Sequence, residues 1–204
     1  MQSLKNNRLI PYNTKAFWDL FSVHSYNSLS PKRYNHLLNQ LGREALYFGG
    51  YNDHINPDYD SAVILVTNIG LMLSPHLLTH PHLKFKPKVS GVYIYRVDSR
   101  MGKALQIVSS SPLATNGDLQ IDDPRQMETF KPHKIFDQGD LVAYDIKNPQ
   151  PSLLLLSQTF HADWKAKLRT TTGWQKAQTV SVNGFFQGVF LPKGTEKVVL
   201  KFLP

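Results

Sequence analysis

The chain has 204 residues, of which 41% are hydrophobic and 11% aromatic, and its formal net charge is +8. A chain of this size and composition can bury a substantial core, so it should fold without disulfide or metal cross-links. It contains no cysteine, which excludes disulfide scaffolds, zinc–thiolate sites and thiol nucleophiles. No apolar run approaches the roughly 20 residues of a membrane-spanning helix, and the N-terminal MQSLKNNRLIPYN has no signal-peptide core. We therefore expect this chain itself to be soluble.

Residues 1–29 are predicted to form an N-terminal arm. Aromatic side chains recur in its second half, without the sustained spacing of an amphipathic helix. These are Phe17, Trp18, Phe21 and Tyr26. We expect this arm to pack on the body of the protein, with room for one short helix inside it.

Residues 30–41 are predicted to form a helix. Ser30 can cap its first turn, Pro31 suits the first helical position, and Gly42 can end it in a left-handed conformation. One face of this helix is apolar and should dock on the rest of the domain. That stripe consists of Tyr34, Leu37, Leu38 and Leu41.

Most of the chain from residue 30 to residue 204 is predicted to be one β-rich domain. Short apolar segments alternate with clusters of Pro, Gly, Asn and Asp, which is typical of an antiparallel sandwich. The predicted strands are residues 69–74, 91–97, 104–108, 140–146, 151–158, 164–169, 179–182, 185–191 and 197–203. Residues 60–68 fit a strand or a helix. The predicted class is α+β, mainly an antiparallel, jelly-roll-like β-sandwich with one or two helices on its N-terminal side.

The C-terminal half contains a predicted turn, a candidate hinge and a predicted corner. Asn183-Gly184 predicts a tight turn between two strands. Pro149 to Pro151 is a candidate hinge that would subdivide the domain. The segment SQTFHADWKAKL, residues 157–168, is interpreted as the end of one core strand, a corner at residues 161–163, and a new strand anchored by Trp164.

Charge is unevenly distributed along the chain. After residue 160 the basic side chains face only Asp163 and Glu196, whereas residues 117–144 are rich in aspartate. The basic residues are Lys165, Lys167, Arg169, Lys176, Lys193, Lys197 and Lys201. Such a region suits phosphate or an anionic membrane surface, although a solvated strand face explains the same pattern.

Polar clusters elsewhere are weaker signals. His76, His80 and His82 offer imidazoles, but Pro81 interrupts them and no glutamate lies between, so a polar loop is preferred to a zinc site. Residues 52–60 carry acidic groups without the glycine and final glutamate of a calcium loop, which favours capping and turn roles. We therefore predict no metal and no cofactor.

Catalytic signatures are also weak. No GxSxG elbow, phosphate-binding glycine loop or dinucleotide fingerprint occurs. His161 and Asp163 would be the acid–base pair of a soluble hydrolase, but neither a nucleophile nor a spaced carboxylate pair accompanies them. We predict no catalytic residue in this chain.

Several short motifs occur in a consistent order along the chain. Near the C-terminus these are LLLSQTFHADWKA (154–166), VNGFFQGVFLPKG (182–194) and VVLKF (198–202). Earlier matches are YNSLSPKRY (26–34), NIGLMLS (68–74) and GVYIY (91–95). Together these motifs resemble the extracytoplasmic C-terminal domain of bacterial YfhO-type membrane proteins. The chain departs from that family where Ala162-Asp163 replaces the usual Pro-Gly before the tryptophan.

This resemblance implies that the chain is an accessory domain on the extracytoplasmic face of the bacterial cell membrane. The parent would be a polytopic glycosyltransferase-like protein that uses lipid-phosphate sugars. The implied partners are its own transmembrane region and envelope glycans or anionic lipid head groups, with no nucleic acid. A free-standing carbohydrate-binding or envelope-assembly module is the alternative.

Within that interpretation, exposed aromatic and basic side chains are the candidate ligand contacts. Rings can stack on sugars, and ammonium or guanidinium groups can meet phosphates. The candidates are Trp164, Trp174, Tyr95, Lys165, Lys167 and Arg169.

Overall fold

The computed structural model of the protein describes residues 70–74, 77–97, 102–108, 118–121, 126–146 and 150–204. The chain divides into two compact units, Met1–Ile64 with Ile69–Ser99, and Leu65–Asn68 with Arg100–Pro204. The predicted arm, the predicted helix at residues 30–41 and the ambiguous segment 60–68 lie outside the described residues. Of the candidate hinge, residues 150 and 151 are described, and they belong to the second unit.

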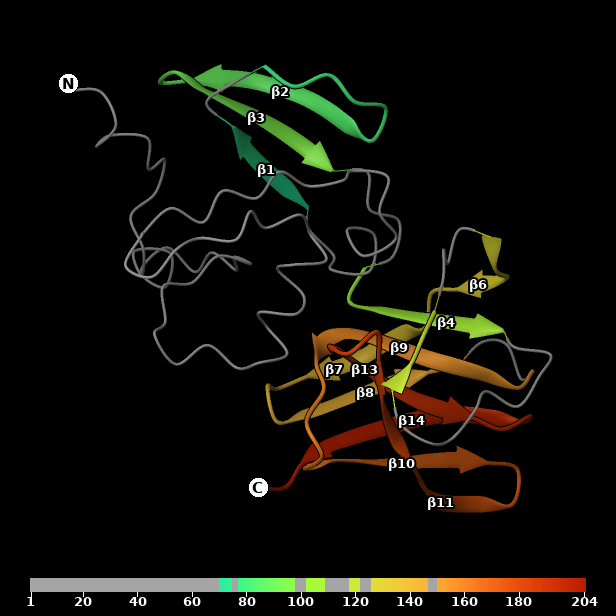
Figure 1. Ribbon diagram of the computed structural model, residues 1–204. Coiled ribbons are helices and arrows are strands. Elements are labelled where there is room, and N and C mark those ends of the chain that lie inside the picture. The colour runs from blue at the N-terminus through green and yellow to red at the C-terminus, as the bar shows by residue number, and fades with distance from the viewer. Residues whose placement is uncertain (1–69, 75–76, 98–101, 109–117, 122–125, 147–149) are drawn as a thin grey trace. The chain divides into compact units, whose positions relative to one another are not determined.

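The first unit contains a three-stranded antiparallel sheet, with the strands in the order β1 (Leu71–Ser74), β3 (Val92–Val97) and β2 (Leu83–Val89) (Figure 1). A tight turn joins β2 to β3, where Ser90 and Gly91 both have positive φ, 48° and 84°. Tyr95, on the central strand, is only 1% exposed. Its hydroxyl accepts a hydrogen bond from the backbone N–H of Leu78 at 2.6 Å. The phenol thus links the sheet to the segment that follows β1.

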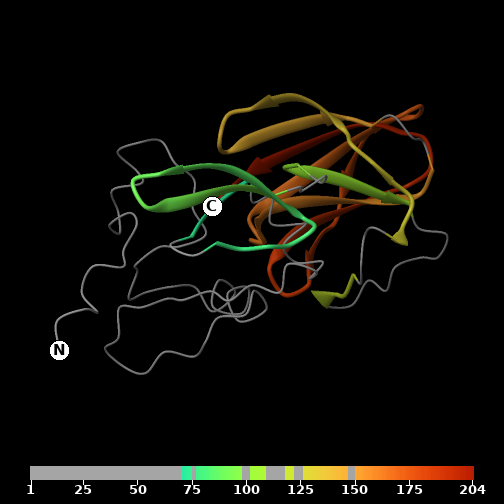
Figure 2. The same cartoon turned by 90° about the horizontal axis from the view of Figure 1, so that it is seen from above.

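The second unit contains a five-stranded and a six-stranded sheet, shown from two directions in Figures 1 and 2. The five-stranded sheet has the order β11 (Gly173–Ala177), β10 (Trp164–Thr170), β14 (Thr195–Phe202), β8 (Leu141–Asp145), β7 (His133–Asp137). The six-stranded sheet has the order β5 (Asp118–Leu119), β12 (Thr179–Val182), β13 (Phe186–Leu191), β9 (Ser152–Thr159), β4 (Ala104–Val108), β6 (Thr129–Phe130).

Neighbouring strands are antiparallel throughout the described sheets, except that β5 runs parallel to β12. The chain passes repeatedly from one sheet to the other, so that β9 and β10 are consecutive yet lie in different sheets. The described residues contain no α-helix. The predicted antiparallel, sandwich-like β architecture is therefore confirmed for this part of the chain.

The core of the second unit lies between the two sheets. Alternate residues of β8, β10 and β14 point inward and meet alternate residues of β4, β9 and β13, which is the pattern of a sandwich interior. The buried cluster comprises Ala104, Val142, Tyr144, Ile146, Leu154, Leu156, Ala166, Leu168, Val189, Leu191, Val198 and Leu200. Burial of this apolar surface, at about 25 cal/mol per Å², is the main favourable term for the unit.

Strand β9 is buried on both of its faces. Leu154 and Leu156 point into the core, and the alternate residues Leu153 and Leu155 are also at most 3% exposed. The adjacent strand allows this close packing because Gly188 carries no Cβ. A Cβ at Gly188 would lie 2.7 Å from Val182 Cγ2. A continuous apolar run of this length is typical of a strand without a solvent face.

The Asn183-Gly184 turn forms as predicted between β12 and β13. Both residues have positive φ, 49° and 71°, as in the type I′ turns of β-hairpins. The side chain of Asn183 accepts a hydrogen bond from Ile121 N at 2.7 Å and donates one to Ile121 O at 3.0 Å. Asp118 Oδ1 also accepts a hydrogen bond from Gly184 N at 2.7 Å. The turn therefore fixes residues 118–121 at the edge of the six-stranded sheet, where residues 118 and 119 form β5.

Candidate functional site

The corner predicted at residues 161–163 joins β9 to β10 and carries the chain from one sheet to the other. Trp164 N donates a hydrogen bond to His161 O at 3.1 Å, and Leu203 N donates to Asp163 O at 3.0 Å. The Trp164 ring is partly buried against the core cluster and lies 5.5 Å from the Phe202 ring. The corner is thus confirmed, with Trp164 as its anchor.

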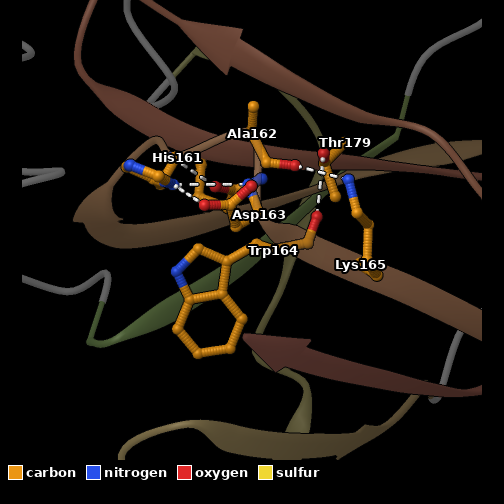
Figure 3. Close-up of polar contacts among 7 residues, drawn as sticks. His161, Ala162, Asp163, Trp164, Lys165 and Thr179 are labelled. Atoms are coloured by element: carbon orange, nitrogen blue, oxygen red, sulfur yellow. Dashed lines mark hydrogen bonds and ion pairs between the residues drawn. The ribbon is translucent and has the colours of Figure 1, made fainter. Parts of the chain in front are cut away.

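His161 and Asp163 form an exposed pair within this corner. Nδ1 of His161 lies 3.3 Å from Oδ2 of Asp163, with side-chain exposures of 59% and 39%. Among the described residues, His161 also contacts the Phe202 ring and, through its backbone N–H, the side-chain oxygen of Gln187. None of these partners is a nucleophile. The hydroxyl of Thr179 nearby donates to Trp164 O at 3.3 Å and serves the backbone (Figure 3).

Strand β10 separates an apolar face from a basic face. Ala166 and Leu168 point into the core, whereas Lys165, Lys167 and Arg169 are exposed. The alternation follows from the pleat, which sends successive side chains to opposite faces. Three cations therefore line the outer face of the five-stranded sheet.

The register of the neighbouring strands extends this row into a patch. On β14, Lys201 stands opposite Lys165 and Lys197 stands opposite Arg169. On β11, Lys176 stands opposite Lys167, because the two strands are antiparallel. We call this surface the basic face; it consists of Lys165, Lys167, Arg169, Lys176, Lys197 and Lys201.

Carboxylates neutralise one end of the basic face. Arg169 Nε lies 3.7 Å from Glu196 Oε2, and Lys197 Nζ lies 3.8 Å from Asp145 Oδ1. The remaining lysines, Lys165, Lys167, Lys176 and Lys201, pair with no carboxylate of the described residues. Lys165 Nζ instead donates to Ala162 O at 2.8 Å, which holds its charge at the corner. Positive charge is therefore concentrated away from Glu196 and Asp145.

Trp174 is the exposed aromatic side chain of this sheet. It lies on the edge strand β11, is 55% exposed and stands opposite Arg169. A ring in this position can stack on an apolar sugar face while its neighbour meets an anion. The structure thus brings together four of the predicted ligand contacts, Trp174, Lys165, Lys167 and Arg169.

The other two predicted contacts are placed differently. Trp164 faces the core, since it shares the inward side of β10 with Ala166. Tyr95 belongs to the first unit, is buried, and packs edge-on against Phe85 with 5.9 Å between ring centres. Tyr95 presents no open face, and Trp164 is only partly exposed. Conversely, Lys176, Lys197 and Lys201 were not predicted as contacts. Lys176 lies two residues after Trp174 on β11, and Lys201 lies four residues after Lys197 on β14, so each pair shares one side of its strand.

Two ionisable groups near the five-stranded sheet have shifted pKa values. For Asp137, burial acts to raise the pKa, but the ammonium groups of Lys103, at 3.3 Å, and Lys134, together with a hydrogen bond from the backbone of Gly139, leave the pKa lowered. Burial, and secondarily the charge of Asp137, raises the pKa of Tyr144 to about 12. Both groups lie away from the basic face, so they bear on stability.

No candidate metal centre emerges among the residues that the structure describes. His80 and His82 lie with ring centres 5.4 Å apart, and Nδ1 of His80 accepts a hydrogen bond from His82 N. His76 and residues 52–60 lie outside the described residues. Within the described ranges, no helix is long and apolar enough to cross a membrane.

Comparison of the chain with protein families, curated proteins and solved structures finds no match. The resemblance to YfhO-type proteins therefore rests on the motifs alone. Of these, LLLSQTFHADWKA covers most of β9, the corner and the start of β10. VNGFFQGVFLPKG covers the Asn183-Gly184 turn, β13 and the turn that leads to β14. These motifs coincide with the places where the chain turns or changes sheet.

Proposed function

We propose that this chain is a non-catalytic extracytoplasmic accessory domain that binds an anionic component of the bacterial cell envelope on its basic face. Its parent would be a membrane-embedded glycosyltransferase-like protein. The domain would hold an acceptor glycan or lipid close to the membrane part, which performs the chemistry. In its finer details the proposed fold is jelly-roll-like, with one or two helices packed on the N-terminal side.

The observation that carries the binding proposal is the alignment of cations across β11, β10 and β14. Like charges on neighbouring strands repel one another and lower stability when nothing intervenes. Here Lys167 and Lys176 are opposite each other, as are Lys165 and Lys201. A bound anion would turn these repulsions into attraction, since clustered lysines raise the local concentration of negatively charged ligands.

The motifs support the choice of compartment and parent. They run through both halves of the chain, and the best-defined one contains the corner and Trp164. The reading frame of the gene provides a direct test of the parentage. Predicted membrane spans upstream of this domain support a membrane parent, whereas a frame that encodes these residues alone refutes it.

A free-standing carbohydrate-binding module is the second candidate, favoured by Trp174. Its indole is 55% exposed at the sheet edge beside Arg169. Sugar-binding modules commonly present such a ring to a pyranose face. In that case neutral glycans should bind, and Trp174→Ala should abolish their binding without affecting anionic ligands.

Binding is tested by titrating the full chain with vesicles of neutral lipid, vesicles containing phosphatidylglycerol, and soluble anionic and neutral envelope polysaccharides. Binding is read from Trp fluorescence and amide spectra. The proposal predicts that anionic ligands bind, and that their affinity falls as salt increases. Binding of neutral ligands alone would favour the second candidate, and unchanged spectra with every ligand would refute both.

A further inference from the structure

The three-stranded sheet of the first unit carries most of the exposed apolar side chains in the described part of the chain. Seven large hydrophobic side chains are exposed there, and four of them belong to residues 71–89. These four are Leu71, Leu77, Phe85 and Val89, with exposures of 63%, 66%, 55% and 53%. Single exposed apolar residues are common on protein surfaces, whereas a group of them marks an interaction surface.

The strand register brings two of these side chains onto one face of the sheet. Val92, Ile94 and Arg96 alternate onto the same side of β3, the strand that forms a hairpin with β2 (Figure 1). Leu71 of β1 stands opposite Arg96, as does Lys84 of β2, and Val89 stands opposite Val92. Directly opposed residues share a face. We call this surface the hairpin face; it consists of Leu71, Lys84, Val89, Val92, Ile94 and Arg96.

The hairpin face is the outward face of this sheet. On the opposite face, Tyr95 and Val97 are buried, and so is Leu83, which pairs with Val97. Lys84 and Arg96 are exposed instead. The sheet therefore packs by one side and presents aliphatic and cationic side chains together on the other.

Every Lys, Arg, Asp or Glu in this region is a cation. Residues 61–97 contain Lys84, Lys86, Lys88 and Arg96, and no aspartate or glutamate. Among the described residues, no carboxylate pairs with Lys86, Lys88 or Arg96. Lys88 Nζ lies 4.5 Å from the centre of the Tyr93 ring, which keeps its charge on the hairpin. The aliphatic surface is therefore bordered by positive charge alone.

This combination selects one kind of partner. A second copy of the chain would bring like charges together, and Pro87 lacks the N–H needed for continuous pairing along the edge strand β2. A soluble anionic polymer would match the cations and leave Leu71 and Val89 in a polar environment. An anionic lipid bilayer offers phosphates at its surface and hydrocarbon a few ångströms deeper. Lys84 and Arg96 have long side chains that can reach the phosphates while their aliphatic stems lie beside the apolar residues.

We propose that the hairpin face docks on the surface of an anionic lipid bilayer. Leu71 and Val89 enter the boundary between head groups and acyl chains, and Lys84 and Arg96 contact the lipid phosphates. The hairpin face shares no residue with the basic face and belongs to the first unit. Docking of this kind is therefore a second interaction, beyond the proposed binding on the basic face.

A single label on the hairpin face tests this docking directly. The chain contains no cysteine, so Val89→Cys gives one site for a polarity-sensitive fluorophore in the full chain. Vesicles of phosphatidylcholine with phosphatidylglycerol should shift the emission to shorter wavelength, and a quencher carried on the lipid should reduce it. Phosphatidylcholine alone and soluble anionic polysaccharide should leave the emission unchanged. The control label is Ile135→Cys, at an exposed position of β7 in the second unit, and its emission should not shift.

Two matched variants measure the apolar contribution without changing net charge. Leu71→Gln/Val89→Thr makes the hairpin face polar, and Leu203→Gln/Ile135→Thr makes the same two kinds of change at exposed positions of the second unit. Vesicle affinity is measured by sedimentation. We expect the first variant to lose roughly tenfold in affinity, because apolar surface no longer leaves water. The control should stay within about twofold of wild type. Circular dichroism checks that each variant folds, and Leu71→Cys is the second labelling position if Val89→Cys does not.

The outcomes separate this docking from the proposed function. Vesicle binding without an emission shift on the hairpin face, or equal losses in both double variants, would overturn the docking and leave the basic face as the binding surface. Polysaccharide binding without vesicle binding would do the same, and no binding of any ligand would overturn both. Wild-type dimers that dissociate in Leu71→Gln/Val89→Thr would show that a second copy covers the hairpin face, and would also overturn the docking.

Discussion

Lys167 and Lys176 face each other across β10 and β11 on the exposed side of the five-stranded sheet. No carboxylate of the described residues pairs with either ammonium group. Directly opposed like charges destabilise a strand pair. The sheet therefore bears a small energetic cost at the position where the proposed ligand would bind, a relationship often seen where function competes with stability.

Replacing one of these lysines should separate stability from binding. Lys176→Glu converts the repulsive pair into an attractive one, so the free energy of unfolding should rise by about 0.2–1 kcal/mol. Binding of an anionic polymer should fall at the same time. Urea denaturation at low and high salt measures the first effect, which high salt should reduce. A loss of stability in Lys176→Glu would argue that Lys176 has a structural role.

Gly188 is predicted to be intolerant of any side chain. A Cβ would approach Val182 Cγ2 to 2.7 Å and Val180 Cγ2 to 2.9 Å, and both valines are buried. Overpacking of this kind typically costs about 1–3 kcal/mol, so Gly188→Ala should lower the free energy of unfolding by that amount.

Gly70→Ala is the matched control for this substitution, because a Cβ there meets no atom within 4 Å. Chemical denaturation of both variants should show a clear loss for Gly188→Ala and little change for Gly70→Ala. Equal effects in the two variants would contradict the close packing of β13 against β12.

The Asn183 side chain should contribute to stability through its hydrogen bonds to Ile121. Asn183→Ala removes both bonds. It also places alanine, whose side chain cannot form local hydrogen bonds, at a φ of 49°. Asn183→Gly relieves the backbone cost but still loses the bonds. We expect both variants to be destabilised, alanine more than glycine, with the shared part about 1–3 kcal/mol. Full stability in Asn183→Gly would show that the turn needs only its backbone conformation.

The raised pKa of Tyr144 predicts that the free energy of unfolding falls at high pH. Its pKa is raised from 10.0 to about 12 because burial disfavours the phenolate. The stability that the neutral phenol contributes is fully present below pH 10 and is lost as the pH rises toward 12. Tyr144→Phe should lack this component, so its free energy of unfolding should fall less between these pH values. Identical alkaline profiles for the two proteins, measured by denaturation at each pH, would contradict the burial of the hydroxyl.

Central strands were predictable from sequence, whereas most edge strands were not. Segments such as 104–108 and 179–182 have two neighbours in a sheet and a buried face, which selects apolar, β-branched residues. The strands that were not predicted, β2, β5, β6, β7 and β11, all lie at sheet edges. Strand β2, with the sequence LKFKPKV, buries only Leu83. A strand with one neighbour and little burial leaves no apolar period in the sequence.

The candidate site was predictable only along β10. Alternation within residues 164–170 places Lys165, Lys167 and Arg169 on one face, and the same alternation assigns Trp164 to the core. The addition of Lys176, Lys197 and Lys201 depends on strand order and register, which are set by long-range packing. Tyr95 was predicted as an exposed ligand contact for the same reason. Strand pairing places it on the central strand β3, where its side chain is buried.

Amide shift mapping during titration with a soluble anionic envelope polysaccharide tests the central claim most directly. Binding on the basic face predicts that the largest changes occur in residues 165–169, 174–176 and 197–201, and that they diminish in Lys167→Gln/Lys176→Gln. Changes confined to other residues, or a spectrum that stays the same at saturating polysaccharide, would contradict the claim.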